Sequence, residues 1–324
     1  MKKLYTLTFF LLSFFIQAQE KNYAIGDTLF YYKGTITDDK ICSSYYSIIK
    51  EKEDMGKERK YKMYGFQRLK DSTKYFLHSE YETKFVEVQT SDGFQRFYHK
   101  NGNIASEGKT KKGRAIGLWK HWYKDGKIMD ERLIPERVPL AKVDKHYTLK
   151  NFWNKEGVQT IIDGNGTFEL KKDSVFNKGF YKNGKRHGKF SGFIKNRKYY
   201  EEYYNDGKLI SGVSWDENNE KFKYKQVFSN PRYKKGQESI KNLLVKNFNI
   251  PKYAYEKKIE GRMLISFRVK KDGEIDNIKV AKSLCDPCDV EAIRVVKMMK
   301  KWRPAKYRGQ NINIRYTLPV SYKL

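Results

Sequence analysis

A five-residue phrase that ends in glycine recurs along the middle of the chain, and it constrains the fold more than any other feature. Each copy begins with an aromatic residue and ends with Asn-Gly, Asp-Gly or, once, Glu-Gly. The aromatic residues are Tyr98, Trp122, Trp153, Phe180 and Tyr203, and the glycines are Gly102, Gly126, Gly157, Gly184 and Gly207. Asn-Gly and Asp-Gly favour two-residue type I′ hairpin turns, because both central positions need a positive φ. The phrase therefore predicts an array of β-hairpins whose stacked units share a core.

Only one face of each strand in such an array can be buried, so the aromatic residues of a phrase must divide between the two faces. We expect Trp122 and its equivalents, four residues before each glycine, to pack between units. Tyr123, Tyr181 and Tyr204, one residue further on, are then expected to face outward. Any binding role of the phrase would belong to that outer face.

A second element, Gly-x-aromatic, follows the turns, as in Gly117-Leu118-Trp119. Together the two elements resemble the MORN-like repeats of exported bacterial proteins, over residues 91–215. The resemblance implies a β-hairpin array that serves as an interaction surface, and it implies no catalysis. Residues 19–90 carry short bursts of aromatic residues and β-formers that predict a further β-rich region. Residues 216–227 are expected to form a linker.

The first 18 residues have the pattern of a secretory signal peptide. Lys2 and Lys3 precede an almost wholly apolar run, and the small residue Ala18 offers a cleavage point. The apolar run is about 13 residues long, which is short of the roughly 20 that span a bilayer. We therefore expect export to the periplasm, association with the outer membrane as a candidate, and no transmembrane span in the mature chain. An uncleaved membrane anchor is the alternative.

The formal net charge of +29 gives a strongly basic chain, which often indicates nucleic-acid binding. The export signal argues against a nucleic-acid partner. Anionic partners outside the cytoplasm are lipid headgroups, lipopolysaccharide and cell-wall polymers. The lysines are spread along the chain, so a solvated basic surface without a specific partner is the alternative interpretation.

No catalytic set is recognisable, and the sequence predicts no enzyme, no cofactor and no metal site. A Gly-x-Ser-x-Gly motif and a phosphate-binding loop are both missing. The adjacent pair Glu201 and Glu202 would point to opposite faces of a strand. Cys285 and Cys288 could close a disulfide in an oxidising compartment, with free thiols, a redox motif or a metal site as alternatives.

From residue 228 to residue 324 the pattern changes to alternating helices and strands. Apolar residues at helical spacing occupy 236–248 and again the segment that ends near Met299. Strict alternation over 263–269, 275–280 and 312–320 predicts strands, and Asp272-Gly273 predicts the turn between the first two. We expect two helices on a three-stranded antiparallel sheet, so the whole chain belongs to the α+β class.

This segment resembles the C-terminal domain of TonB. The resemblance rests on Gly261-Arg262-Met263, Phe267-Arg268-Val269, Asp272-Gly273-Glu274-Ile275, Glu291-Ala292-Ile293-Arg294-Val295-Val296, Lys301-Trp302-Arg303-Pro304-Ala305 and Tyr316-Thr317-Leu318-Pro319-Val320. It implies a domain that takes the TonB box of an outer-membrane receptor as an added β-strand. Pro231 and Tyr233 match part of a Gln-Pro-x-Tyr-Pro motif that lies near the bound box in TonB, whereas Asn230 and Lys234 depart from it. The candidate partner-binding residues are Pro231, Tyr233, Ile312, Ile314, Arg315, Tyr316 and Leu318.

The functional hypothesis is a periplasmic protein-binding module related to TonB energy transducers. Its partner would be an envelope protein, with a TonB-dependent receptor as the candidate. The 7 prolines are scattered, so the long Pro-rich spacer of a transducer is missing. We therefore expect binding without force transduction and without a membrane anchor. The alternative is a structural or surface-binding protein whose basic hairpins bind anionic cell-wall or lipopolysaccharide polymers.

Overall fold

The computed structural model describes residues 23–32, 35–38, 43–55, 58–69, 72–87, 90–136, 147–234, 236–299 and 302–323. The predicted signal peptide lies outside these ranges. Within them the chain forms two compact units. The first falls within residues 1–127 and 134–146, and the second within residues 128–133 and 147–324.

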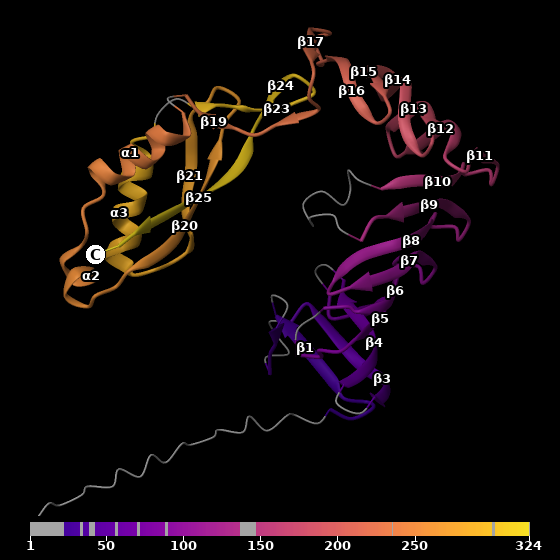
Figure 1. The fold of residues 1–324 in the computed structure, drawn as a ribbon, viewed down its shortest axis with the longest axis horizontal. Coiled ribbons are helices and arrows are strands. Elements are labelled where there is room, and N and C mark those ends of the chain that lie inside the picture. Colours follow the sequence, from indigo (N-terminus) through magenta and orange to yellow (C-terminus); the bar gives the residue numbers. More distant parts are fainter. Residues whose placement is uncertain are drawn as a thin grey trace, which may run out of the picture. The chain divides into compact units, whose positions relative to one another are not determined.

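The first unit is an antiparallel β-structure (Figure 1). Its strands are β1 (Thr28–Tyr32), β2 (Thr35–Ile36), β3 (Tyr45–Met55), β4 (Glu58–Arg68), β5 (Tyr75–Thr83), β6 (Gly93–Tyr98), β7 (Ile104–Lys111) and β8 (Arg114–Trp122). Strands β3 to β8 pair in chain order, and β1 pairs with both β2 and β3. The core of this unit gathers Tyr31, Ile49, Met63 and Tyr81, each at most 3% exposed.

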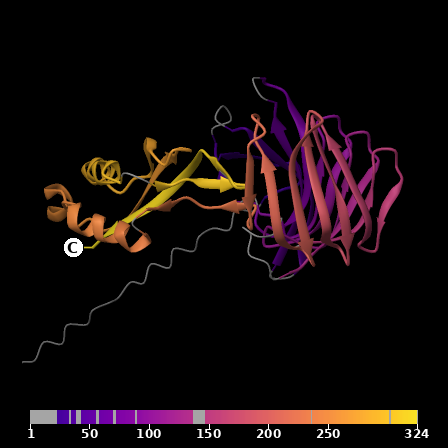
Figure 2. The ribbon, with the colours of Figure 1, turned by 90° about the horizontal axis from the view of Figure 1, so that it is seen from above.

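The second unit begins with another antiparallel array, in which β12 to β16 run side by side (Figure 2). Its strands are β9 (Ile128–Ile134), β10 (Thr148–Trp153), β11 (Gln159–Ile162), β12 (Asn165–Lys172), β13 (Val175–Lys182), β14 (Lys185–Ile194), β15 (Arg197–Asn205), β16 (Lys208–Trp215) and β17 (Lys221–Tyr224). Strand β17 pairs with β16 inside the stretch expected to be a linker, so residues 221–224 extend the array. Nearest-neighbour pairing is what short hairpin connections produce.

Two kinds of turn replace the single kind that the sequence predicted. Asn183-Gly184 has positive φ at both residues, as a type I′ turn requires, and Asp206-Gly207 does the same. At Gly102, Gly126 and Gly157 only the glycine has a positive φ, and its N–H donates to the carbonyl three residues earlier. These three connections are type I turns closed by a glycine bulge. The prediction of type I′ turns is therefore wrong for the first three copies, because their loops are one residue longer.

The buried face of the array is also the opposite of the one expected. Tyr181 and Tyr204 are 4% and 8% exposed, whereas Phe180 and Tyr203 are 42% and 46% exposed. The residue four before the glycine therefore faces outward in these copies, and the residue three before it faces the core. Trp122 is only half-buried, and Trp119 on the same strand is the buried residue.

Glycines inside the strands complete this core by accepting an aromatic ring from the neighbouring strand. A Cβ at Gly179 would lie 2.4 Å from the Phe190 ring, and one at Gly212 would lie 2.3 Å from the Tyr224 ring. The rings lie across the glycines because no side chain stands in their way. A single sheet thereby covers part of its own apolar face.

The C-terminal domain has two layers, with helices on one face of a three-stranded sheet (Figure 1). Its helices are α1 (Gln237–Asn247), α2 (Lys252–Glu256) and α3 (Asp286–Lys297). The sheet has the order β21 (Ile275–Lys282), β20 (Gly261–Val269) and β25 (Ile314–Tyr322). Met263, Ile265, Phe267 and Val269 alternate on β20 toward the helices, and each is 0% exposed. The strict alternation in the sequence therefore predicted this layer correctly.

Five short strands and one short helix were not predicted. The strands are β18 (Phe228–Ser229), β19 (Arg232–Tyr233), β22 (Trp302–Arg303), β23 (Ala305–Tyr307) and β24 (Gln310–Ile312). The expected continuous strand over 312–320 is divided at Asn313, where β24 ends and β25 begins. Helix α2 is a single short turn after Pro251, too brief to leave a periodic pattern.

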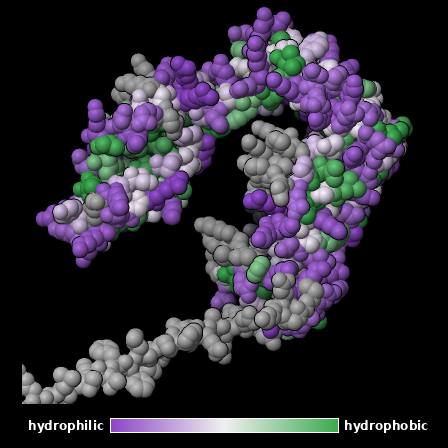
Figure 3. All heavy atoms as spheres, in the orientation of Figure 1, coloured by the Kyte–Doolittle hydropathy of each residue, from purple (hydrophilic) through white to green (hydrophobic). Residues whose placement is uncertain are grey.

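No helix among the described residues is long and apolar enough to cross a membrane. Hydrophilic residues cover most of the face shown in Figure 3, and hydrophobic residues appear there in small groups.

Candidate functional site

The sheet of the C-terminal domain has an edge strand, β25, whose only pairing among the described residues is with β20. The pairing runs without a break from Gly261↔Tyr322 to Val269↔Ile314. An edge strand presents a row of main-chain N–H and C=O groups that another strand can use. Strand β25 is nine residues long, so a ladder of several hydrogen bonds is available on its outer side.

Pro319 indicates which residues of β25 point their main chain outward. Proline has no N–H and is tolerated in an edge strand where that group would face away from the sheet. The pairing with β20 has no register shift, so Arg315, Thr317 and Ser321 share the orientation of Pro319. Their side chains are exposed on the face opposite the helices. Arg315 and Thr317 are therefore the central groups of the open edge.

The other candidate residues of β25 face the helix layer. Ile314 and Tyr316 are partly buried, and Leu318 is 3% exposed. All three belong to the core of the domain or pack against it. Ile312 lies on β24 in a different small sheet, where it pairs with Ala305.

Pro231 and Tyr233 are both buried, and the Trp302 ring lies between Tyr233 and Tyr316 of β25. Tyr233 is 5% exposed and pairs with Trp302 between β19 and β22. Its ring centroid lies 5.6 Å from that of Trp302, which lies 5.2 Å from that of Tyr316. Tyr233 of the partial Gln-Pro-x-Tyr-Pro motif is thus part of the core behind the edge strand.

Cys285 and Cys288 are joined by a disulfide at the start of α3, with Cα atoms 5.1 Å apart. Cys285 is the N-cap residue of the helix, and the N–H of Cys288 donates to its Sγ over 3.2 Å. The Cys288 Sγ also lies 3.2 Å from the hydroxyl of Tyr322, at the end of β25.

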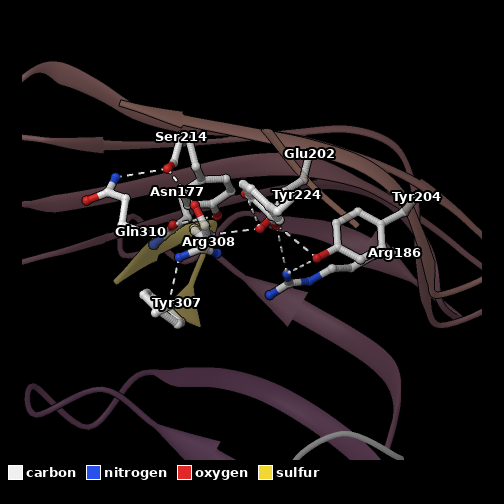
Figure 4. A network of polar contacts seen from close by, with 10 residues as sticks. Asn177, Arg186, Glu202, Tyr204, Ser214, Tyr224, Tyr307, Arg308 and Gln310 are labelled. Atoms are coloured by element: carbon white, nitrogen blue, oxygen red, sulfur yellow. Dashed lines mark hydrogen bonds and ion pairs between the residues drawn. The ribbon is translucent and has the colours of Figure 1, made fainter. Parts of the chain in front are cut away.

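A buried carboxylate, Glu202, connects the hairpin array to the C-terminal domain (Figure 4). Its side chain is 0% exposed. Its Oε2 accepts a hydrogen bond from the Tyr204 hydroxyl, and its Oε1 accepts from the Tyr224 hydroxyl, both over 2.8 Å. Arg308 Nε donates to Oε1 over 2.8 Å from the turn between β23 and β24. A buried charge with this many partners is stable in place, whereas one without them would not be.

Arg308 contacts both the array and the segment that follows it. Its guanidinium carbon lies 3.5 Å from the centroid of the Tyr200 ring, a cation–π arrangement. Its carbonyl accepts from the Ser214 hydroxyl over 2.6 Å, and its N–H donates to the Val227 carbonyl over 2.7 Å. Burial on its own would lower the pKa of Arg308, but the hydrogen bond and the charge of Glu202 raise that pKa above its ordinary value. Arg308 therefore stays positively charged.

Sequence reasoning missed this junction. Arg308-Gly309 is a two-residue turn with φ values of 50° and 82°, similar to those of Asn183-Gly184 and Asp206-Gly207. The turn could not be predicted from the usual Asn-Gly pattern, because arginine stands in place of asparagine and does not normally favour a positive φ. The available signal was the glycine itself, followed by the alternation of the final strands.

These features define the C-terminal domain as a small α+β domain with an open sheet edge. Residues 246–324 match the family model described as Gram-negative bacterial TonB protein C-terminal, which covers the last quarter of the chain. The solved solution structure of the TonB C-terminal domain from Helicobacter pylori is similar at 23% sequence identity. That match covers 27% of this chain and 78% of the other chain, with a TM-score of 0.22. A search of curated protein sequences gave no match.

Proposed function

We propose that this protein is an interaction module of the Gram-negative cell envelope, and that its C-terminal domain binds an extended segment of an envelope protein along β25. The proposal rests on the outer edge of β25, the side away from β20. No strand among the described residues pairs with that side. Main-chain hydrogen bonds would supply most of the affinity, and the exposed side chains of Arg315 and Thr317 would contact the added strand.

The similarity of residues 246–324 to the TonB C-terminal family supports the envelope as the compartment and proteins as the partner class. The conspicuous side chains among the described residues of the C-terminal domain are core residues and surface ion pairs, and they form no recognisable catalytic set. A TonB-dependent receptor is the first candidate partner. The rigid core behind the edge, built on Trp302, would keep β25 in place when a strand adds to it.

Titration of the full chain with a TonB-box peptide tests the proposal. We expect binding in calorimetry, with NMR shifts concentrated on β25. Thr317→Pro removes an outward N–H and places a ring on the edge without disturbing the pairs to β20. The lost hydrogen bond contributes about 1 kcal/mol to binding, and the proline ring adds a steric clash with the incoming strand. Thr317→Pro should therefore weaken binding by about tenfold or more.

Thr317→Ala is the matched control, because it changes the same side chain and keeps the N–H. A peptide with N-methyl groups at the positions facing β25 should fail in the same way as Thr317→Pro. Equal affinities of the proline and alanine variants, with circular dichroism unchanged in both, would rule out strand addition at β25.

A further inference from the structure

The buried face of the array in the second unit contains a cavity of about 460 Å³ that the proposed strand addition does not use. Ligand-binding pockets commonly fall between roughly 300 and 1,000 Å³. Residues of β9, β10 and β12 to β15 line the cavity, and Tyr307 and Arg308 of the β23–β24 hairpin close one side. Its floor is aromatic and aliphatic, and includes Phe152 and Phe168.

Three arginines face this cavity, and each lies over an aromatic ring. Arg132 is 4.8 Å from the Tyr147 centroid, Arg186 is 5.0 Å from that of Phe190, and Arg308 lies on Tyr200. Stacking holds a guanidinium flat and leaves its N–H edge free to bind a carboxylate or phosphate with two parallel hydrogen bonds.

The arginines outnumber the acidic groups beside them. Glu202 is committed to Arg308, and its nearest contact with Arg186 is 3.8 Å. Asp130 pairs with Arg132 over 2.6 Å through a single guanidinium nitrogen, Nη2. The Nε of Arg132 is buried and has no hydrogen-bond partner among the described residues. Three arginines against these two carboxylates leave a local charge of +1 and an unused donor on Arg132. Arg186 Nη1 donates to the Tyr204 hydroxyl over 3.2 Å, and its carboxylate neighbour Glu202 lies beyond hydrogen-bond distance.

The side chains that line the cavity limit the chemical class of ligand that it can bind. An inorganic anion would satisfy the arginines and leave the aromatic floor without a partner. A neutral or wholly apolar ligand would leave a desolvated arginine unpaired, which is costly. A sugar ring suits the floor, because its polarised C–H groups are attracted to the negative face of an aromatic ring. We propose that this cavity binds an acidic saccharide, with its carboxylate or phosphate on Arg132 and Arg186 and its ring against the aromatic floor.

Binding of small sugars to the full chain tests this inference. The probes are glucuronate for a carboxylate, glucose 6-phosphate for a phosphate, glucose as the neutral analogue and inorganic phosphate as the bare anion. We expect saturable binding of at least one acidic sugar in calorimetry or ligand-observed NMR, weakened by salt. Glucose and inorganic phosphate should bind at least about tenfold more weakly than that sugar, since each lacks one of the two interactions.

Arg132→Gln and Arg186→Gln should each weaken binding of the acidic sugar by about tenfold or more, because a hydrogen bond to a charged group is lost. Lys189→Gln is the matched control, since it removes one positive charge from an exposed side chain on β14. Arg132→Lys keeps the charge but loses the paired N–H donors of the guanidinium. Its affinity for the sugar should lie between those of the wild type and Arg132→Gln.

Three results would each overturn the inference. The first is the failure of both acidic sugars to bind. The second is binding of inorganic phosphate as tight as that of the sugars. The third is unchanged sugar affinity in both arginine variants when circular dichroism shows them folded. None of these outcomes bears on strand addition at β25, because β25 does not line the cavity.

Discussion

Glu202 and its tyrosines show how burial changes the properties of single residues. The sequence predicted that Glu201 and Glu202 point to opposite sides of their strand, and only Glu202 is fully buried. Burial, with the nearby charge of Glu202, raises the pKa of Tyr204 to about 12, although Arg186 acts in the opposite direction. The hydroxyl of Tyr204 therefore stays protonated, as its role of donor to Glu202 requires.

The raised pKa of Tyr204 gives a prediction for alkaline stability. Below pH 10 the phenol is protonated in both the native and the unfolded state, so its ionisation does not change the stability. Between about pH 10 and pH 12 the unfolded chain loses the proton and the native protein keeps it, so stability falls as pH rises. Tyr204→Phe removes this proton from the difference between the two states. The decline in the free energy of unfolding should therefore become shallower by up to about 1.4 kcal/mol per pH unit.

Urea unfolding of the second unit, followed by circular dichroism at several pH values from 8 to 11.5, measures this slope. Tyr203→Phe is the control, because Tyr203 is the neighbouring residue and is 46% exposed. An identical pH slope for the wild type and Tyr204→Phe would contradict the prediction.

At the level of strands and turns, the glycine phrase predicted where hairpins turn better than it predicted which face they bury. Positive φ at glycine is a local property, so the corners at Gly184 and Gly207 could be read from the sequence. The choice of the buried face is different, because the side chains of a strand alternate between its two faces whichever face is buried. Gly179 and Gly212 were the missed signal, since a glycine within a strand often marks the close approach of another group.

Gly179→Ala tests the importance of the glycine under Phe190. The added methyl group would lie 2.4 Å from the ring, so the ring must move. We expect a loss of about 1–3 kcal/mol in the free energy of unfolding, the usual cost of overpacking. Lys178→Ala, at the exposed neighbouring position, should change it by no more than about 0.5 kcal/mol. Equal stability of the two variants in urea titrations would show that the ring does not depend on this gap.

At the scale of the whole chain, the ion pair of Arg308 and Glu202 joins residues 106 positions apart. It attaches the β23–β24 hairpin of the C-terminal domain to the array within the second unit. Arg308→Gln removes the cation that is hydrogen-bonded to buried Glu202 and leaves only Arg186, 3.8 Å away. Breaking a buried pair in this way costs about 3–5 kcal/mol. We expect faster hydrogen exchange in β16, β17 and the β23–β24 hairpin.

The double variant Glu202→Gln with Arg308→Gln separates the ion pair from general damage. It removes both charges and should recover part of the exchange protection that the single variant loses. Protection in Arg308→Gln equal to that of the wild type would mean that the hairpin is held by its main-chain contacts alone.

The sequence by itself determined the local features of this protein. These are the hairpin corners, the alternating strands of the C-terminal sheet and the short motifs that resemble a TonB C-terminal domain, each set by residues a few positions apart. The tertiary structure alone decided that Tyr181 and Tyr204 face the core, that Tyr233 is buried behind β25 and that Arg308 reaches Glu202. These outcomes depend on contacts between distant strands, where packing and the need to pair a buried charge override local preference.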